Sequence, residues 1–103
     1  MRHQKLIRDL IPQLIEESGD EARTRTLDTE EYFQALKDKL QEEVEDYLES
    51  EDPEELADIL EIIRNLIEMH VMTYDELEKI RERKLDEHGG FTQHIFLEEV
   101  IEN

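Results

Sequence analysis

Two pairs of carboxylates stand close together in the middle of the chain, and their spacing suits metal chemistry. Glu43 and Asp46 form one pair, and Glu55 and Asp58 form the other. On an α-helix, residues three apart lie side by side on one face. If two such helices fold back as a hairpin, the four carboxylates converge, and their repulsion is strongly unfavourable without a counter-charge. Hard divalent cations, chiefly Mg2+, prefer oxygen ligands of this kind.

The stretch between the pairs has the sequence of a tight connection between two helices. A turn is predicted over residues 50–53, because Asp52 suits an N-cap and the proline after it suits the first helical position. The preceding helix is predicted to start after Asp28, which forms a capping box with the glutamate three residues on. Counting back from the turn, Asp46 comes opposite the stretch Glu55–Asp58.

In the first of these helices, the acids lie at the edge of an apolar stripe. The stripe comprises Phe33, Leu36, Leu40, Val44, Tyr47 and Leu48. At about 100° per residue, Glu43 falls beside it. Lys39 and Asp46 lie a little further round on the same side, and Glu42 points away. Glu43 is therefore predicted at the border of the core, where its side chain can reach into a cleft.

The second helix is more apolar, and its apolar positions sweep about 200° of the helical wheel. They are Leu56, Ile59, Leu60, Ile62, Ile63, Leu66, Ile67, Met69 and Val71. Glu55 falls within this arc and Asp58 lies at its edge. So wide an arc predicts a central helix that packs on two sides or is shared with a partner subunit, and we expect a homo-oligomer.

Each acid also has a simpler interpretation. Glu55 stands three residues after an N-cap, where a glutamate often only completes a capping box. Glu43 and Asp46, taken alone, are ordinary surface acids, with Lys39 as an i,i+4 partner for Glu43. Asp58 is harder to explain in this way, because it lies past the first turn and borders the buried arc, where unpaired acids are uncommon.

The remaining segments also read as helices and loops, which makes the chain all-α. A short helix is predicted at about residues 10–18, followed by a loop over 20–27 that could make a strand-like pass. A capping box at Thr73 opens a last helix that ends at Gly89. Periodicity leaves the tail, residues 91–103, open between a short helix and a strand-like arm.

Composition limits the partners. The 103 residues predict a single domain, 1–103, small enough that association would help it bury a core. Thirty acids against twelve bases give a formal charge of −18, which argues against nucleic acid or an anionic membrane as a partner. The absence of cysteine excludes thiol catalysis and zinc–thiolate sites. No targeting or membrane-spanning segment is recognisable, so a cytoplasmic protein is expected.

The acid pattern, EExxE followed by ExxD on consecutive helices, resembles that of the MazG-type all-α nucleoside triphosphate pyrophosphohydrolases. The phosphoribosyl-ATP pyrophosphohydrolase-like branch is the more similar one. It shares the N-terminal Lys5–Pro12 motif KLIRDLIP, a basic helix end running into Gly89-Gly90-Phe91, and the tail motif IFLEE at residues 95–99. The resemblance covers essentially the whole chain and implies a four-helix-bundle-like fold completed by oligomerisation.

The resemblance also implies roles for individual acids. Glu43, Asp46, Glu55 and Asp58 would bind Mg2+, or alternatively Mn2+, and Glu42 would orient or deprotonate the attacking water. The third acid of the first motif is usually glutamate and is Asp46 here. The spacer between the motifs is also on the short side. These departures predict either water-mediated coordination at Asp46 or a weakened metal site.

The implied reaction is hydrolysis of a nucleoside triphosphate to the monophosphate and pyrophosphate, with non-standard nucleotides among the expected substrates. Mg2+ would neutralise the developing charge and lower the pKa of a bound water. Because acids cannot hold a triphosphate without cations, basic side chains should cover its distal end. The candidates are Lys5, Arg8, Arg25 and Lys84. For Lys84, the alternative is a stabilising charge near a helix C-terminus.

A function from another class competes with hydrolysis. A non-enzymatic acidic helical module could bind a protein partner or mimic the charge of nucleic acid. Such a surface needs exposed acids, and Glu49, Glu51, Glu54 and Glu61 would serve. It does not need acids at the border of the core, and it leaves the basic N-terminal motif unexplained.

Overall fold

The computed structural model describes residues 4–102, and among these residues it is entirely helical, with no strand. The helices are α1 (Ile11–Glu17), α2 (Thr29–Ser50), α3 (Pro53–Leu66), the 3-10 helix η1 (Ile67–His70) and α4 (Tyr74–His88). The chain divides into two compact units, Met1–Val71 and Met72–Asn103. The all-α prediction is confirmed. The loop predicted over residues 20–27 is confirmed, since this segment has no regular structure, and it makes no strand-like pass.

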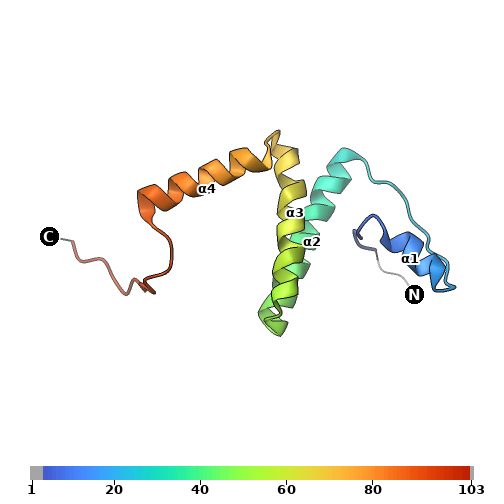
Figure 1. The fold of residues 1–103 in the computed structure, drawn as a ribbon, viewed down its shortest axis with the longest axis horizontal. Helices are drawn as coiled ribbons and strands as arrows, with labels where there is room; N and C mark the ends of the chain where they lie inside the picture. The colour runs from blue at the N-terminus through green and yellow to red at the C-terminus, as the bar shows by residue number, and fades with distance from the viewer. Residues whose placement is uncertain (1–3, 103) are drawn as a thin grey trace. The chain divides into compact units, whose positions relative to one another are not determined.

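The first unit is built on the antiparallel pair α2 and α3, which pack against each other along their length (Figure 1). The capping box predicted at Asp28 is present: its side chain accepts from the backbone N–H of Glu31, and the Glu31 side chain accepts from the backbone N–H of Asp28. Asp52 caps α3, and Pro53 occupies its first turn. Between them Glu51 adopts the left-handed conformation that ends α2. The predicted hairpin is therefore confirmed.

The end of α3 differs from the prediction of one continuous helix through Val71. The α-helix stops at Leu66, and the tighter turn of η1 follows. Val71 then adopts a left-handed conformation with φ of +52°. The residue is 94% exposed. The apolar residues of this segment follow a helical period regardless of which hydrogen-bond pattern the backbone adopts, so the periodicity did not reveal the change.

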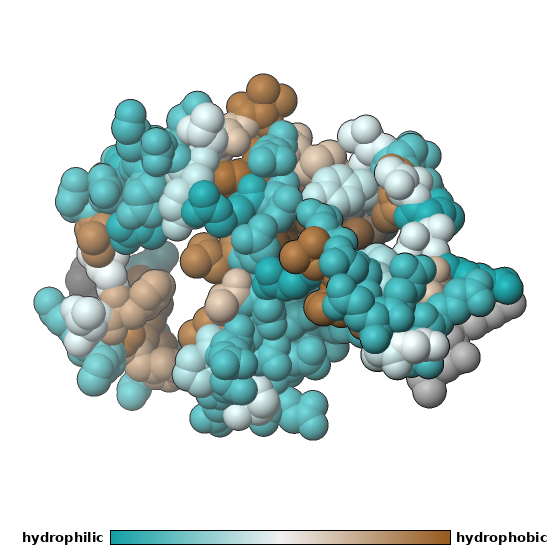
Figure 2. Space-filling view, turned by 45° about the vertical axis from the view of Figure 1, so that its right-hand side comes forward, coloured by the Kyte–Doolittle hydropathy of each residue, from teal (hydrophilic) through white to brown (hydrophobic). Residues whose placement is uncertain are grey.

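The hairpin buries few apolar side chains. Those buried are Leu36, Ile62 and Ile67, and Glu43 is buried beside them. Other apolar side chains of the pair stay exposed, including Leu48 at 69% and Leu60 at 45%. Figure 2 shows hydrophobic patches, coloured brown, on a largely hydrophilic surface. The wide apolar arc predicted for α3 is thus only partly covered within one chain.

The second unit consists of α4 and the C-terminal tail. The Thr73 side chain accepts a hydrogen bond from the backbone N–H of Glu76, which confirms the predicted start, and Gly89 ends the helix with φ of +80°. The tail, residues 91–102, contains a turn at its start and no helix or strand, so the short-helix alternative is wrong. No helix in the described part of the chain has the length and apolar content needed to cross a bilayer.

Candidate metal centre

Five carboxylates of the hairpin gather into two overlapping groups. Glu42, Glu43 and Asp46 of α2 form the first triad, and Glu43 joins Glu55 and Asp58 of α3 in the second triad. Within each triad, one carboxylate oxygen of every member lies within 4.8 Å of the others. Glu43 belongs to both triads because it is the acid closest to the helix–helix interface. The carboxylates predicted to converge are therefore close together, as two triads that share Glu43 and not as one group of four.

Glu43 is the most buried of these acids, with only 8% of its surface exposed. Its position beside the apolar stripe of α2 turns it toward α3. A buried carboxylate needs a partner, and the Nζ of Lys39, one turn earlier, lies 3.3 Å from its Oε1. The predicted i,i+4 pairing of Lys39 with Glu43 is confirmed. Glu43 is therefore not an ordinary surface acid, although it has the counter-ion expected of one.

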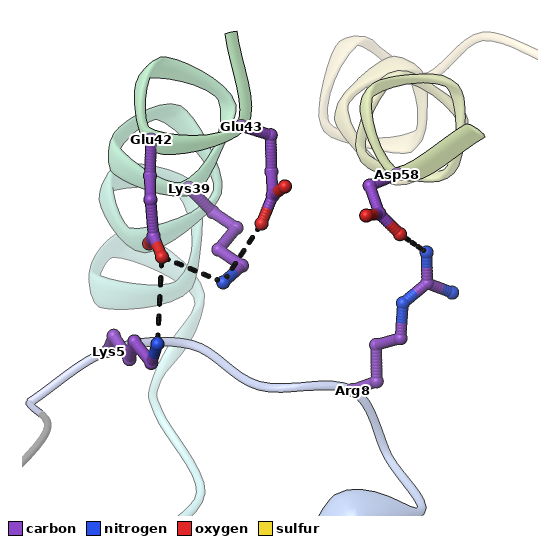
Figure 3. Close-up of polar contacts among 6 residues, drawn as sticks. All are labelled: Lys5, Arg8, Lys39, Glu42, Glu43 and Asp58. Carbon is purple, nitrogen blue, oxygen red and sulfur yellow. Dashed lines mark hydrogen bonds and ion pairs between the residues drawn. The ribbon is translucent and has the colours of Figure 1, made fainter. Parts of the chain in front are cut away.

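Glu42 does not point away from the site, as the helical wheel predicted. Its Oε1 lies 3.4 Å from the Nζ of Lys39 and 3.6 Å from the Nζ of Lys5 (Figure 3). The wheel describes only the direction of the Cα–Cβ bond. A glutamate side chain is long enough to lean back toward the N-terminus of its helix, where the residue three positions earlier lies. The Glu42 carboxylate therefore lies with the other acids and forms ion pairs with the ammonium groups of Lys39 and Lys5.

Asp58 is held by a residue from the far end of the unit. The Nη2 of Arg8 donates a hydrogen bond of 2.7 Å to its Oδ1. Arg8 and Lys5 lie on the same irregular N-terminal segment, and Figure 3 shows this segment passing by both helices, with Lys5 toward α2 and Arg8 toward α3. Two of the four predicted substrate-binding bases therefore lie at the acids.

Glu55 does not complete a capping box. The backbone N–H of Asp52, which such a glutamate would bind, donates instead to the Oγ of Ser50 at 3.1 Å. The Glu55 carboxyl is half-buried and faces Glu43. Hydrogen bonding to Glu43, partial burial and the neighbouring charges raise the pKa of Glu55 from 4.5 to about 7. The raised pKa reflects the like-charged carboxyls that face one another in the second triad.

The other predicted binding residues are placed differently. The guanidinium of Arg25 pairs with Glu31 at the start of α2, at 3.1 Å, and lowers the pKa of that carboxyl. Lys84 lies in α4, in the other unit. Asp46 is exposed and belongs only to the first triad. Lys39 was predicted only as a partner for Glu43, because nothing in the sequence showed that Glu42 would fold back onto it.

The donor set suits a hard cation. Every potential ligand in the two triads is a carboxylate oxygen, the type that Mg2+ and Mn2+ prefer, and no histidine takes part. Mg2+ holds its ligands at about 2.0–2.1 Å in octahedral geometry, so oxygens up to 4.8 Å apart would have to move closer together to share one ion. Glu43, Glu55 and Asp58 would hold the ion between two helices.

Comparison with known proteins identifies no relative. No family model, no curated protein and no solved structure matches this chain.

Proposed function

We propose that this protein is a Mg2+-dependent nucleoside triphosphate pyrophosphohydrolase of the MazG type, releasing a monophosphate and pyrophosphate. The observation that carries the proposal is the second triad. Glu43, Glu55 and Asp58 come from two helices, lie within 4.8 Å of one another, and include one deeply buried member. A solvated acidic face would not need to bury Glu43 or to raise the pKa of Glu55.

A divalent ion bound to this triad would neutralise the charge of a polyphosphate and activate a water for attack. The chain itself supplies the complementary cations. Lys5 and Arg8 lie on the N-terminal segment with side chains 45% and 57% exposed, so both can exchange a carboxylate for a phosphate oxygen. Arginine suits this exchange because its planar fork of N–H groups binds phosphate as readily as carboxylate.

Glu42 is the proposed proton acceptor for the attacking water. Its carboxylate lies at the edge of the cluster, 37% exposed, and is oriented by the ammonium groups of Lys39 and Lys5. A base in this position reaches both solvent and the site, and the two ammonium groups keep its carboxylate in one orientation. If Lys5 moves onto a phosphate, Glu42 keeps only its ion pair with Lys39. One lone pair of the Glu42 carboxylate then becomes free to accept a proton.

The proposal is tested by incubating the protein with a panel of standard and damaged nucleotides in Mg2+ or Mn2+. The measurement is the release of pyrophosphate together with the monophosphate. Asp58→Asn should abolish turnover, and Glu49→Gln, an exposed acid on α2, is the matched control and should leave it unchanged. Orthophosphate alone, or no turnover with any nucleotide, would contradict the proposal.

The second candidate is a non-enzymatic acidic module that binds a partner protein or mimics nucleic acid. Its support is that Glu49, Glu51, Glu54 and Glu61 are all exposed on the hairpin. The same panel separates the two functions, because a binding module turns over no nucleotide. A module of this kind should also keep its partner binding when Asp58 is replaced by asparagine and lose it when the exposed glutamates are replaced.

A further inference from the structure

Two helices of the first unit start with the same residue types but use them differently. Asp28 caps α2 and Asp52 caps α3, and each aspartate is followed three positions later by a glutamate. At the start of α2, the Glu31 side chain accepts a hydrogen bond of 3.3 Å from the backbone N–H of Asp28 and completes a capping box. At the start of α3, the carboxylate of Glu55 lies in the second triad instead.

The backbone N–H of Asp52 is taken by Ser50, not by Glu55. The Ser50 Oγ accepts its hydrogen bond at 3.1 Å. Ser50 is the last residue of α2, and Glu51 after it is left-handed, with φ of +55°. The chain therefore turns sharply between the two helices, and this turn brings the N–H of Asp52 back to the serine hydroxyl.

The start of α2 shows that a hydroxyl two positions before the N-cap is not enough to produce this bond. Thr26 stands at that position relative to Asp28, but it lies in a segment without regular structure. The N–H of Asp28 goes to Glu31. The difference between the two starts therefore depends on the tight turn that follows Ser50.

An N–H group has a single proton, so Ser50 and Glu55 are alternative acceptors for it. The capping position is electrostatically favourable for Glu55, because a carboxylate is stabilised at a helix N-terminus. In the second triad the same carboxylate faces the like-charged Glu43 and Asp58. Glu55 would also have to fix several side-chain torsions to reach the N–H, whereas the Ser50 hydroxyl is held next to it by the turn.

We propose that Ser50 is a positioning residue, which keeps the Glu55 carboxylate in the second triad by occupying the N–H of Asp52. This inference rests on the proposed metal-dependent function, because Glu55 is one of the ligands of that site. Ser50 belongs to neither triad and acts only through Glu55. It is exposed, and alanine favours a helix more than serine does, so Ser50→Ala should fold as the wild type does.

The first measurement needs neither metal nor nucleotide. NMR on the full chain, at a pH at which Glu55 is ionised, detects scalar coupling across a hydrogen bond between the amide nitrogen of Asp52 and the side-chain carboxyl carbon of Glu55. The wild type should show no such coupling, and Ser50→Ala should show it, because the N–H is then open to the glutamate. Ser50→Thr keeps the hydroxyl and should resemble the wild type.

The second measurement is the affinity for Mn2+, determined by calorimetric titration. Ser50→Ala should bind Mn2+ about fivefold more weakly, because the ion must first draw Glu55 away from a capping bond of ordinary strength. Ser50→Thr should restore the affinity. In a Glu55→Ala background, Ser50→Ala should cause no further loss, because the residue through which it acts is gone.

Ser18→Ala is the matched control. It also removes a serine hydroxyl from the end of a helix, since the Ser18 Oγ donates to the carbonyl oxygen of Ile15 at the end of α1. This change should alter neither the NMR signal of Asp52 nor the affinity for Mn2+.

Other results would overturn the inference. Ser50→Ala without coupling between Asp52 and Glu55, or with the Mn2+ affinity of the wild type, would show that the serine does not hold Glu55 in place. An equal loss of affinity in the Glu55→Ala background would show that Ser50 acts on the fold and not through Glu55. Coupling in Ser50→Ala, together with no pyrophosphate release from any nucleotide by the wild type, would instead contradict the proposed function and leave this inference standing.

Discussion

Arg8 donates a hydrogen bond to Asp58 across fifty residues of chain, and this contact joins the N-terminal segment to the acidic hairpin. Arg8 lies just before α1, and Asp58 lies in the first half of α3. Together with the ion pair of Lys5 and Glu42, it makes two bases of the N-terminal segment counter-ions of the acidic cluster. It also means that Asp58 already has a partner before any metal arrives.

The first prediction concerns Asp58→Asn. Removing the charge relieves repulsion on Glu55 and removes the exposed Arg8 pair, so the free energy of unfolding without metal should change by less than about 1 kcal/mol. The stabilisation by Mg2+ should shrink, because a ligand is lost. For the wild type it should reach about 2.7 kcal/mol at one hundred times the dissociation constant. The measurement is thermal unfolding across a Mg2+ titration at fixed ionic strength.

The control for this experiment is Glu49→Gln, which removes one exposed charge from α2 away from the triads. Its Mg2+ shift should equal that of the wild type. Equal Mg2+-induced shifts in stability for the wild type, Asp58→Asn and Glu49→Gln would mean that Mg2+ only screens the bulk charge. That result would contradict the proposed metal site.

The second prediction is a dependence of stability on pH. The pKa of Glu55 is about 7 in the folded chain and 4.5 ordinarily, so the folded state binds this proton more tightly than the unfolded state. The resulting stability is fully present below pH 4.5 and is lost as the pH rises through 7. Unfolding between pH 5.5 and 8 should show this loss without metal. Glu55→Gln should reduce the slope, and a slope identical to the wild type would contradict the assignment.

The third prediction is self-association through the face of the hairpin away from the acids. Val44 and Leu48 lie about 100–140° round α2 from Glu43, and Leu56 and Leu60 lie on the corresponding side of α3. All four are exposed. Because this apolar face matches a copy of itself, two chains related by a two-fold axis would cover it on both. Light scattering should therefore report a mass above that of one chain.

A pair of equally exposed leucines provides the matched variants for this measurement. Leu60 on α3 is 45% exposed and Leu85 on α4 is 46% exposed. Leu60→Gln should shift the protein toward the monomer, and Leu85→Gln should not. A wild-type chain that stays monomeric at micromolar concentration would rule out the proposed contact.

The fourth prediction concerns Val71, a β-branched residue in the left-handed region at φ of +52°. This conformation costs an L-residue about 1–2 kcal/mol, and asparagine tolerates it better. The side chain is 94% exposed, so replacing it removes no packing. Val71→Asn should therefore raise the free energy of unfolding by about 1 kcal/mol in denaturant titrations. Val100→Asn, in the exposed tail, should change nothing, and a destabilised Val71→Asn would disprove the strain.

Much of the first unit could be predicted because its signals are local. The capping box at Asp28, the Asp52–Pro53 start and the i,i+4 pair of Lys39 and Glu43 each depend on residues within one turn. Helical spacing then sufficed to bring Glu43 near Asp58. These features need no knowledge of the rest of the fold.

The features that could not be predicted depend on side-chain reach or on long-range contacts. Glu42 was misplaced because a helical wheel ignores the length of the side chain, which brings its carboxylate to Lys39. The pairing of Arg8 with Asp58 links positions with no periodic relationship. The change from α3 to η1 leaves the apolar pattern intact, so periodicity contained no signal for it.

The short connection between α2 and α3 has a consequence for the order of folding. Only Glu51 and Asp52 separate the two helices, so closing this hairpin costs little chain entropy, and the hairpin should form early. The N-terminal segment is made before the hairpin during synthesis but has nothing to bind until residues 42–58 are folded. Lys5 and Arg8 should therefore dock after the hairpin has formed, because the converged carboxylates that attract them exist only in the folded hairpin. A divalent ion present at that stage would compete with the docking step itself.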